Sequence, residues 1–179
     1  MRRFFDRAAP RWDERIQPES PERLATLAAG LDRLTRDPAR VLDVGTGTGA
    51  GAFLLARRYP EAEIVGIDLS PAMIEVAYEK AAERGAAAIR FEVADVESFA
   101  PGDQFDLVTL VNMPPFFDAI ARLVRPGGHV LCVATLGART PFYTPPGTLA
   151  RGFERRGLRT LTSENVGLGS YYLAELPDS

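Results

Sequence analysis

The sequence has few of the residues that carry metals, disulfides and catalytic protons. Among its 179 residues are one cysteine, Cys132, and one histidine, His129. A single cysteine cannot form a disulfide within the chain, and its place in an apolar run predicts a buried strand position in a reducing compartment. No cluster of cysteines and histidines and no carboxylate pair stands at ligand spacing, so we expect no bound metal.

Long apolar runs and an excess of positive charge are also lacking. No uncharged run reaches the roughly 18 residues of a membrane span, and the charged residues after Met1 leave no apolar core for a signal peptide. We therefore expect a cytoplasmic protein. The 21 basic residues, of which only Lys80 is a lysine, nearly balance the 24 acidic ones. This balance argues against nucleic acid and favours a small-molecule substrate, with monomer or homodimer left open.

The chain does contain a regular alternation of strand and helix signals. Apolar runs rich in branched residues predict strands at 40–44, 62–67, 89–93, 104–111 and 130–134. Helical patterns lie between them at 50–58, 71–84 and 116–124, and a turn is predicted at 125–128. Repeated β–α–β units with right-handed crossovers give a doubly wound, mostly parallel sheet covered by helices on both faces. We expect one α/β domain.

Both ends of the chain depart from this alternation. Residues 1–38 predict a helical covering segment with a proline-rich break near 18–21, ahead of the main domain at 39–179. The predicted elements of the last third are a helix and two strands, at 148–156, 158–166 and 170–176. Only Gly167-Leu168-Gly169 separates the two strands, and so short a connection joins antiparallel strands. The sheet should therefore end in an antiparallel hairpin.

A glycine-rich turn follows the first predicted strand and opens a helix. In Asp43-Val44-Gly45-Thr46-Gly47-Thr48-Gly49 the glycines allow a tight turn and close approach to a ligand, and the helix N-terminus offers N–H groups to it. Asp68 ends the second strand, where a carboxylate can accept both hydroxyls of a ribose. Its alternative role is to cap the next helix, but Ser70 is already placed to do so. We predict a nucleotide-like cofactor.

Two classes of cofactor fit this turn. Gly45, Gly47 and Ala50 satisfy the dinucleotide pattern G-x-G-x-x-G/A, so an NAD(P)-dependent oxidoreductase is one alternative. Asp43 favours the other class, because a carboxylate inside an apolar strand needs a strong partner, such as the ammonium group of S-adenosylmethionine. The alternative partners for Asp43 are local backbone N–H groups.

The sequence resembles the class I S-adenosylmethionine-dependent methyltransferases. Segment 43–49 matches their first motif, D/E-x-G-x-G-x-G, and Arg125-Pro126-Gly127-Gly128 and the terminal hairpin are similar to theirs. The resemblance covers 41–176 and implies a Rossmann-like fold with a seven-stranded sheet, S-adenosylmethionine as cofactor and methyl transfer to a small molecule. It also places Asp95 and Val96 at the adenine. The cofactor-binding candidates are Asp43, Gly45, Thr46, Gly47, Gly49, Asp68, Leu69, Asp95, Val96 and Asn112.

The N-terminal run from Phe4 to Asp13 is similar to the F-D-x-x-A-x-x-Y-D start of ubiquinone and menaquinone C-methyltransferases, with Trp12 in place of the tyrosine. In those enzymes this segment folds over the cofactor and helps to exclude water, so a lid is one interpretation. An amphipathic helix packed on the sheet is the other. The candidates for an acceptor pocket, from this segment and from the loops after the fourth and fifth strands, are Phe5, Trp12, Met113, Phe116, Phe142 and Tyr143.

The segment Asn112-Met113-Pro114-Pro115 does not complete the N/D-P-P-Y/F motif of enzymes that methylate amino groups of DNA, RNA and protein, because Met113 directly precedes the prolines. We therefore assign no nucleobase chemistry. His129 precedes the fifth strand, at the opposite edge from the cofactor, so we expect catalysis to rest on alignment in an apolar pocket. The candidate bases are Tyr143, Asp118 and Asp6. A cofactor-binding module without acceptor chemistry is a further alternative.

Overall fold

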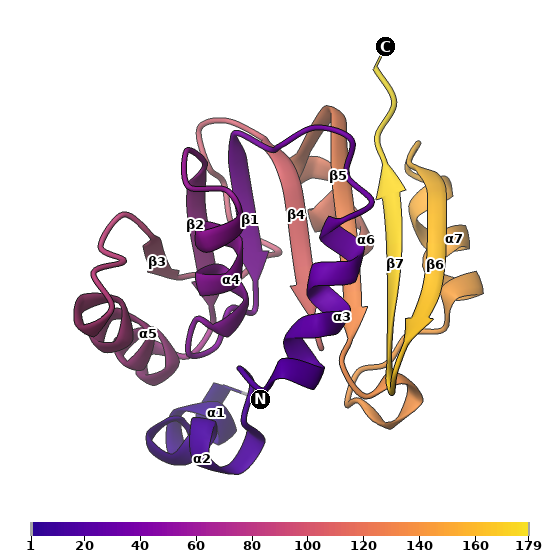
Figure 1. Cartoon of the computed structure of the whole chain (residues 1–179). Coiled ribbons are helices and arrows are strands. Elements are labelled where there is room, and N and C mark those ends of the chain that lie inside the picture. Colours follow the sequence, from indigo (N-terminus) through magenta and orange to yellow (C-terminus); the bar gives the residue numbers. More distant parts are fainter. Residues whose placement is uncertain (1, 179) are drawn as a thin grey trace.

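A seven-stranded sheet forms the centre of the computed structural model, which describes residues 2–178 (Figure 1). The strands are β1 Arg40–Val44, β2 Glu63–Asp68, β3 Arg90–Val93, β4 Phe105–Val111, β5 Val124–Ala134, β6 Arg159–Val166 and β7 Gly169–Glu175. Their order is β3-β2-β1-β4-β5-β7-β6. The first five strands run parallel, and β7 pairs antiparallel with both β5 and β6. The predicted mostly parallel sheet with a terminal antiparallel hairpin is confirmed.

Helices cover both faces of this sheet. The helices are α1 Arg2–Ala8, η1 Ala9–Arg11, α2 Trp12–Ile16, α3 Pro21–Leu31, α4 Ala50–Arg58, α5 Pro71–Glu83, α6 Phe117–Leu123, η2 Gly137–Arg139 and α7 Pro146–Glu154. Alternate residues of β1 face opposite layers: Val41 packs in one cluster with α3, α4 and α5, whereas Leu42 packs in the other with α6 and α7. Burial on both faces explains the nearly continuous apolar runs. Within residues 2–178 no helix is long and apolar enough to cross a membrane.

The N-terminal segment divides into two parts with different neighbours. Helix α3 packs on β5, β7 and β6, whereas α1 and η1 lie against α5. A break separates the two parts, as predicted: Gln17 follows α2 with a φ of 50°, and Ser20 precedes Pro21 at the first position of α3. Met1 and Ser179, which belong to the predicted segments 1–38 and 39–179, lie outside the described residues.

Strand β5 is longer than predicted, and the prediction of a separate turn at 125–128 is wrong. The chain passes through this segment as a strand, kinked at Gly127, where φ is 72°. The Gly127 N–H donates to the Leu176 carbonyl at 2.6 Å, and the Leu176 N–H donates to the Gly128 carbonyl at 2.9 Å. Pairing with a segment so distant in sequence overrides the local turn signal. Helix α6 consequently ends at Leu123.

Helix α7 begins two residues before the predicted start. Pro145 is extended and Pro146 takes the first helical position, where its missing N–H costs nothing. The hairpin between β6 and β7 turns at Gly167, which has a φ of 56°, and Leu168. The remaining boundaries differ from the predicted ones by two residues or fewer.

Candidate functional site

The glycine-rich turn lies where β1 ends, beside the carboxyl end of β2. Gly45, Gly47 and Gly49 have φ values of 68°, 55° and 90°, which L side chains rarely adopt. The N–H groups of Gly45 and Thr46 donate to the Ile67 carbonyl at 2.8 and 3.0 Å, which holds the turn against β2. A Cβ atom at Gly47 would have no neighbour within 4 Å. The turn therefore has an open side on which a ligand can approach the backbone.

Asp43 lies beneath this turn and is only 2% exposed. The hydroxyl of Thr46 donates to Oδ2 at 2.7 Å, and that of Thr109 donates to Oδ1 at 2.8 Å. Burial raises the pKa of Asp43 to about 6, although these two hydrogen bonds act against the rise. Backbone N–H groups and a ligand ammonium are the partners expected from the sequence: a backbone hydrogen bond at Ala52 is present and also lowers the pKa, whereas the two threonines were not predicted. Contact with the cofactor ammonium stays a prediction.

Asp68 lies at the end of β2, beside the open side of the turn. Its Oδ2 accepts the Gly47 N–H at 3.0 Å, and its Oδ1 accepts the Ser70 N–H at 2.9 Å. Burial raises the pKa of Asp68, and the two N–H donors oppose that rise. Ser70 caps α5 by accepting the Met73 N–H at 3.2 Å, as predicted, so Asp68 is not needed as the cap. The ribose role of Asp68 stays a prediction.

Two exposed apolar side chains flank this edge of the sheet. Leu69 is 41% exposed and Val93, at the end of β3, is 48% exposed. Asp95 follows on the exposed loop, where its Oδ1 accepts the Glu97 N–H at 3.0 Å. Val96, in contrast, is 5% exposed and packs in the core, so its backbone is the part that can face a ligand. Open glycine backbone, two carboxylates and an apolar rim fit an adenosine-containing cofactor.

Asn112 and Met113 follow β4 at the same edge. Asn112 has a φ of 56°, its Oδ1 accepts the Thr135 N–H at 2.9 Å, and its Nδ2 donates to the Thr135 hydroxyl at 3.1 Å. The side chain thus joins the ends of β4 and β5. Met113 crosses the turn, because a Cβ atom at Gly45 would overlap the Met113 sulfur. A cofactor contact of Asn112 stays a prediction.

A narrow pocket opens beside Met113, between the ends of β4 and β5 and the loop that precedes α7. Of the predicted acceptor-pocket residues, Met113, Phe142 and Tyr143 line it. The other three lie elsewhere: Phe5 packs edge-on against Trp12 in the N-terminal segment with 5.6 Å between ring centroids, and Phe116 precedes α6. Among the described residues that form the wall of the pocket, none carries a charged side chain.

Comparison with known proteins identifies the family. Residues 41–128 match a family model described as a methyltransferase domain. The ubiquinone/menaquinone biosynthesis C-methyltransferase UbiE of Syntrophotalea carbinolica is 31% identical over 194 aligned residues, covering 99% of this chain and 77% of that relative. The chain belongs to the class I S-adenosylmethionine-dependent methyltransferases. Members of this family use S-adenosylmethionine as cofactor.

A second curated relative and a solved structure are also similar to this chain. A demethylmenaquinone methyltransferase of Deinococcus radiodurans is 36% identical, covering 73% of this chain and 58% of that relative. A solved structure described as a DhpI–SAH complex has the same fold, with a TM-score of 0.72, 19% identity and coverage of 98% and 94% of the two chains. The chain spans 28%, 58% and 62% of the length of three curated relatives that it matches. The oxidoreductase alternative finds no support.

The three candidate bases lie in three different places. Tyr143 lines the pocket. The Asp118 side chain is 89% exposed and accepts Arg156 Nε at 2.7 Å, a hydrogen bond that lowers the pKa of Asp118. Asp6 accepts the Ser70 hydroxyl at 2.6 Å. Of these three residues, only Tyr143 lines the pocket.

His129 and the pocket lie at opposite ends of the sheet. His129 pairs with Leu107 near the start of β4 and with Glu175 at the end of β7. Burial lowers the pKa of His129. His129 lies within β5 rather than before it, at the predicted end of the sheet away from the glycine-rich turn. That it does not act as the base stays a prediction. Over residues 2–178, no group of three or more histidine, cysteine and acidic side chains is placed to hold a metal ion.

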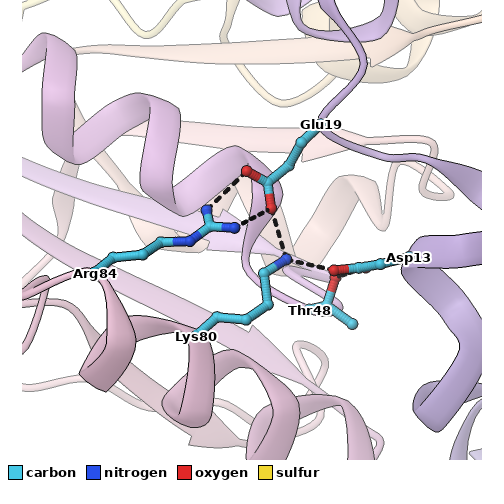
Figure 2. A network of polar contacts seen from close by, with 5 residues as sticks. All are labelled: Asp13, Glu19, Thr48, Lys80 and Arg84. Atoms are coloured by element: carbon cyan, nitrogen blue, oxygen red, sulfur yellow. Dashed lines mark hydrogen bonds and ion pairs between the residues drawn. The ribbon is translucent and has the colours of Figure 1, made fainter.

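A network of charged side chains attaches the N-terminal segment to the glycine-rich turn, as Figure 2 shows. Asp13 Oδ1 accepts the Thr48 hydroxyl at 2.6 Å, and Asp13 Oδ2 lies 2.6 Å from Lys80 Nζ. Glu19 Oε1 also lies 2.6 Å from Lys80 Nζ, and Glu19 receives two hydrogen bonds from Arg84. Sequence reasoning missed this network. Its one available signal was that Lys80 is the only lysine.

Proposed function

We propose that this chain transfers the methyl group of S-adenosylmethionine to a small, uncharged molecule bound in the pocket beside Met113. The observation that carries this proposal is the position of Met113, which both covers Gly45 and lines the pocket. The cofactor turn and the pocket thus share a wall. Direct transfer requires this proximity, because donor and acceptor must be aligned at near-contact distance.

The residues around the turn contact different parts of the cofactor. Gly47 lets the cofactor approach the backbone, and Asp68 accepts hydrogen bonds from the ribose hydroxyls. Leu69 and Val93 flank the adenine with apolar surface, and the Asp95 carboxylate accepts a hydrogen bond from the adenine amino group. The geometry that supports these roles is the shared edge of the sheet and the exposure of the apolar pair.

Catalysis by this chain then consists of orienting the acceptor and excluding water. Bound S-adenosylmethionine supplies a sulfonium methyl group that is already strongly electrophilic. Met113 and Phe142 give the pocket an apolar wall in which a nucleophile loses its hydration shell. Tyr143 lines the same pocket, and its hydroxyl would form a hydrogen bond with the attacking group. We assign the positioning of the attacking group to Tyr143.

The wall chemistry supports an uncharged acceptor. Its polar groups are neutral, and include the hydroxyls of Thr140, Ser163 and Ser170. A carboxylate or phosphate bound there would be desolvated with no counter-ion in the wall, which is strongly unfavourable. A hydroxylated aromatic ring, by contrast, would find apolar surface and hydrogen-bond partners together.

Two experiments test this function in sequence. Calorimetric titration with S-adenosylhomocysteine, with NAD and NADP as controls, should show selective binding of the first ligand, and failure to bind it would overturn the proposal. Methyl-tritiated S-adenosylmethionine is then supplied with neutral phenols and with the benzoates of matching ring pattern, for example hydroquinone and 2,5-dihydroxybenzoate. We expect the neutral acceptors to be labelled, and we expect the labelling rate to fall strongly in the Tyr143→Phe variant. Preferential labelling of the carboxylates would contradict the assignment of an uncharged acceptor.

A further inference from the structure

Lys80 joins three parts of the chain that are far apart in sequence (Figure 2). It projects from α5, and its ammonium group lies 2.6 Å from a carboxylate oxygen of Asp13 in α2 and 2.6 Å from one of Glu19, just before α3. The ammonium also lies 5.6 Å from the centre of the Phe53 ring in α4. The Lys80 ammonium therefore pairs with two acids of the N-terminal segment and also contacts the Phe53 ring on the helix that follows the glycine-rich turn.

The setting of Lys80 makes these contacts hard to replace with water. Its side chain is 12% exposed, whereas the Arg11–Glu14 pair on the same segment has side chains that are 77% and 72% exposed. Glu19 is partly buried, which opposes its ionisation, but hydrogen bonds from Arg84 and Lys80 outweigh this effect and lower its pKa. Without Lys80, Asp13 and Glu19 would face each other with one cation fewer, and their repulsion would favour release of the segment.

The other contacts of this segment reach the cofactor-binding residues themselves. Asp13 bonds with its second oxygen to Thr48, which lies inside the glycine-rich turn and is 2% exposed. Asp6 accepts the hydroxyl of Ser70, whose N–H donates to Asp68. The segment is thus attached on both sides of the edge where the cofactor binds. Movement of the segment would therefore widen the approach to this edge beyond the opening already present at Gly47.

We propose that Lys80 is a positioning residue that keeps residues 2–19 closed over the glycine-rich turn, and that separation of Lys80 from Asp13 limits cofactor exchange. This inference rests on the proposed function, because it places the cofactor at the turn. A residue that merely stabilised the fold would, when replaced, lower affinity through faster dissociation. Loss of a closing contact instead raises the rates of both association and dissociation.

The first test uses the single tryptophan, which precedes Asp13 and is half-buried. Acrylamide quenching of Trp12 fluorescence is compared in the native protein, Lys80→Met, Lys80→Arg and Arg11→Gln, without cofactor. We expect increased quenching in Lys80→Met alone, because Lys80→Arg keeps the charge and Arg11→Gln removes only the exposed pair. Equal quenching in all four proteins, with unchanged melting temperatures, would show that Lys80 does not hold the segment.

The second test follows the binding of S-adenosylhomocysteine by stopped-flow fluorescence of Trp12. Both rate constants should rise about tenfold in Lys80→Met and in Asp13→Asn, and added salt should raise them in the native protein but not in Lys80→Met. A fall in the association rate, or no change in either rate, would overturn the proposal. If the native protein binds no S-adenosylhomocysteine, the proposed function fails and the exchange step with it. The quenching experiment still decides whether Lys80 closes the segment.

Discussion

The hydroxyl of Thr109 in β4 donates to the Asp43 carboxylate in β1 at 2.8 Å, at a point where both side chains are buried. A second hydroxyl, from Thr46, occupies the other carboxylate oxygen. A Cβ atom at Gly51 would lie only 3.0 Å from this carboxylate, so α4 passes directly over it. The first acid of the glycine-rich motif therefore ties together two strands, the turn and the helix that follows.

Replacement of Asp43 by asparagine should change how stability depends on pH. The pKa of Asp43 is raised from 3.8 to about 6 in the folded protein, so the folded state binds this proton more tightly than the unfolded state. The resulting stabilisation is fully present below the unfolded pKa and is lost as pH rises through the folded pKa. Relative to Asp43→Asn, the native free energy of unfolding should therefore fall by about 2 kcal/mol between about pH 4 and pH 7. Urea unfolding across this range measures it, and parallel curves would contradict the prediction.

Gly47→Ala should abolish cofactor binding with little damage to the fold. The added Cβ would meet no protein atom within 4 Å, but it would project from the open side of the turn. Gly85→Ala, between α5 and β3, is the matched control, because Gly85 has a φ of 65° against 55° at Gly47 and equally open surroundings. Both variants should lose about 1 kcal/mol of stability through backbone strain. Calorimetry should show loss of S-adenosylhomocysteine binding in the first variant only, and retained binding there would remove Gly47 from the site.

Asp68→Ala should weaken S-adenosylhomocysteine binding by about 1.5 to 3 kcal/mol, the usual cost of losing hydrogen bonds to a charged group. Exposed Asp103, on the loop before β4, provides the control substitution Asp103→Ala. Since Asp68 also accepts the Gly47 N–H, melting temperatures are needed alongside the titrations. Unchanged affinity in a folded Asp68→Ala variant would exclude the ribose role.

Cys132 should react slowly with thiol reagents in the native protein. Cys132 is half-buried rather than fully buried, and it lines the pocket beside Met113. Burial raises the pKa of this thiol to about 12, against an ordinary value of 9.0, so very little thiolate exists at neutral pH. We expect labelling by Ellman's reagent at about pH 8 to be roughly 1,000-fold slower than in the urea-unfolded chain. Rapid labelling without unfolding would show that the pocket wall opens in solution.

The fold could be predicted from the sequence because most central strands are buried on both faces. Such burial gives apolar runs with well-defined ends. Because the ends of β1 and β2 are well defined, the helix α4 between them could also be placed correctly. The extension of β5 could not be predicted in this way. It depends on hydrogen bonds between Gly127 and Leu176, and local glycine and proline signals indicate a turn instead.

The candidate site could be located from the sequence only where a recognisable motif marks it. The glycine-rich turn follows β1 directly and Asp68 ends β2, so both positions can be located from the apolar runs that predict these strands. The Lys80 network has no such signature, because Lys80 and Asp13 are 67 residues apart and an ion pair leaves no periodic pattern. The buried side chain of Val96 and the bond between Asn112 and Thr135 likewise depend on packing between distant segments.

The two ends of the described chain lie at opposite edges of the sheet (Figure 1). Helix α1 lies against α5 at the edge of the glycine-rich turn, whereas Leu176 pairs with Gly128 at the far edge. A protein immobilised on a biosensor through its C-terminal side would present the ligand-binding edge to the flowing solution. Immobilisation through the N-terminal side would press that edge, and the segment that covers it, against the chip.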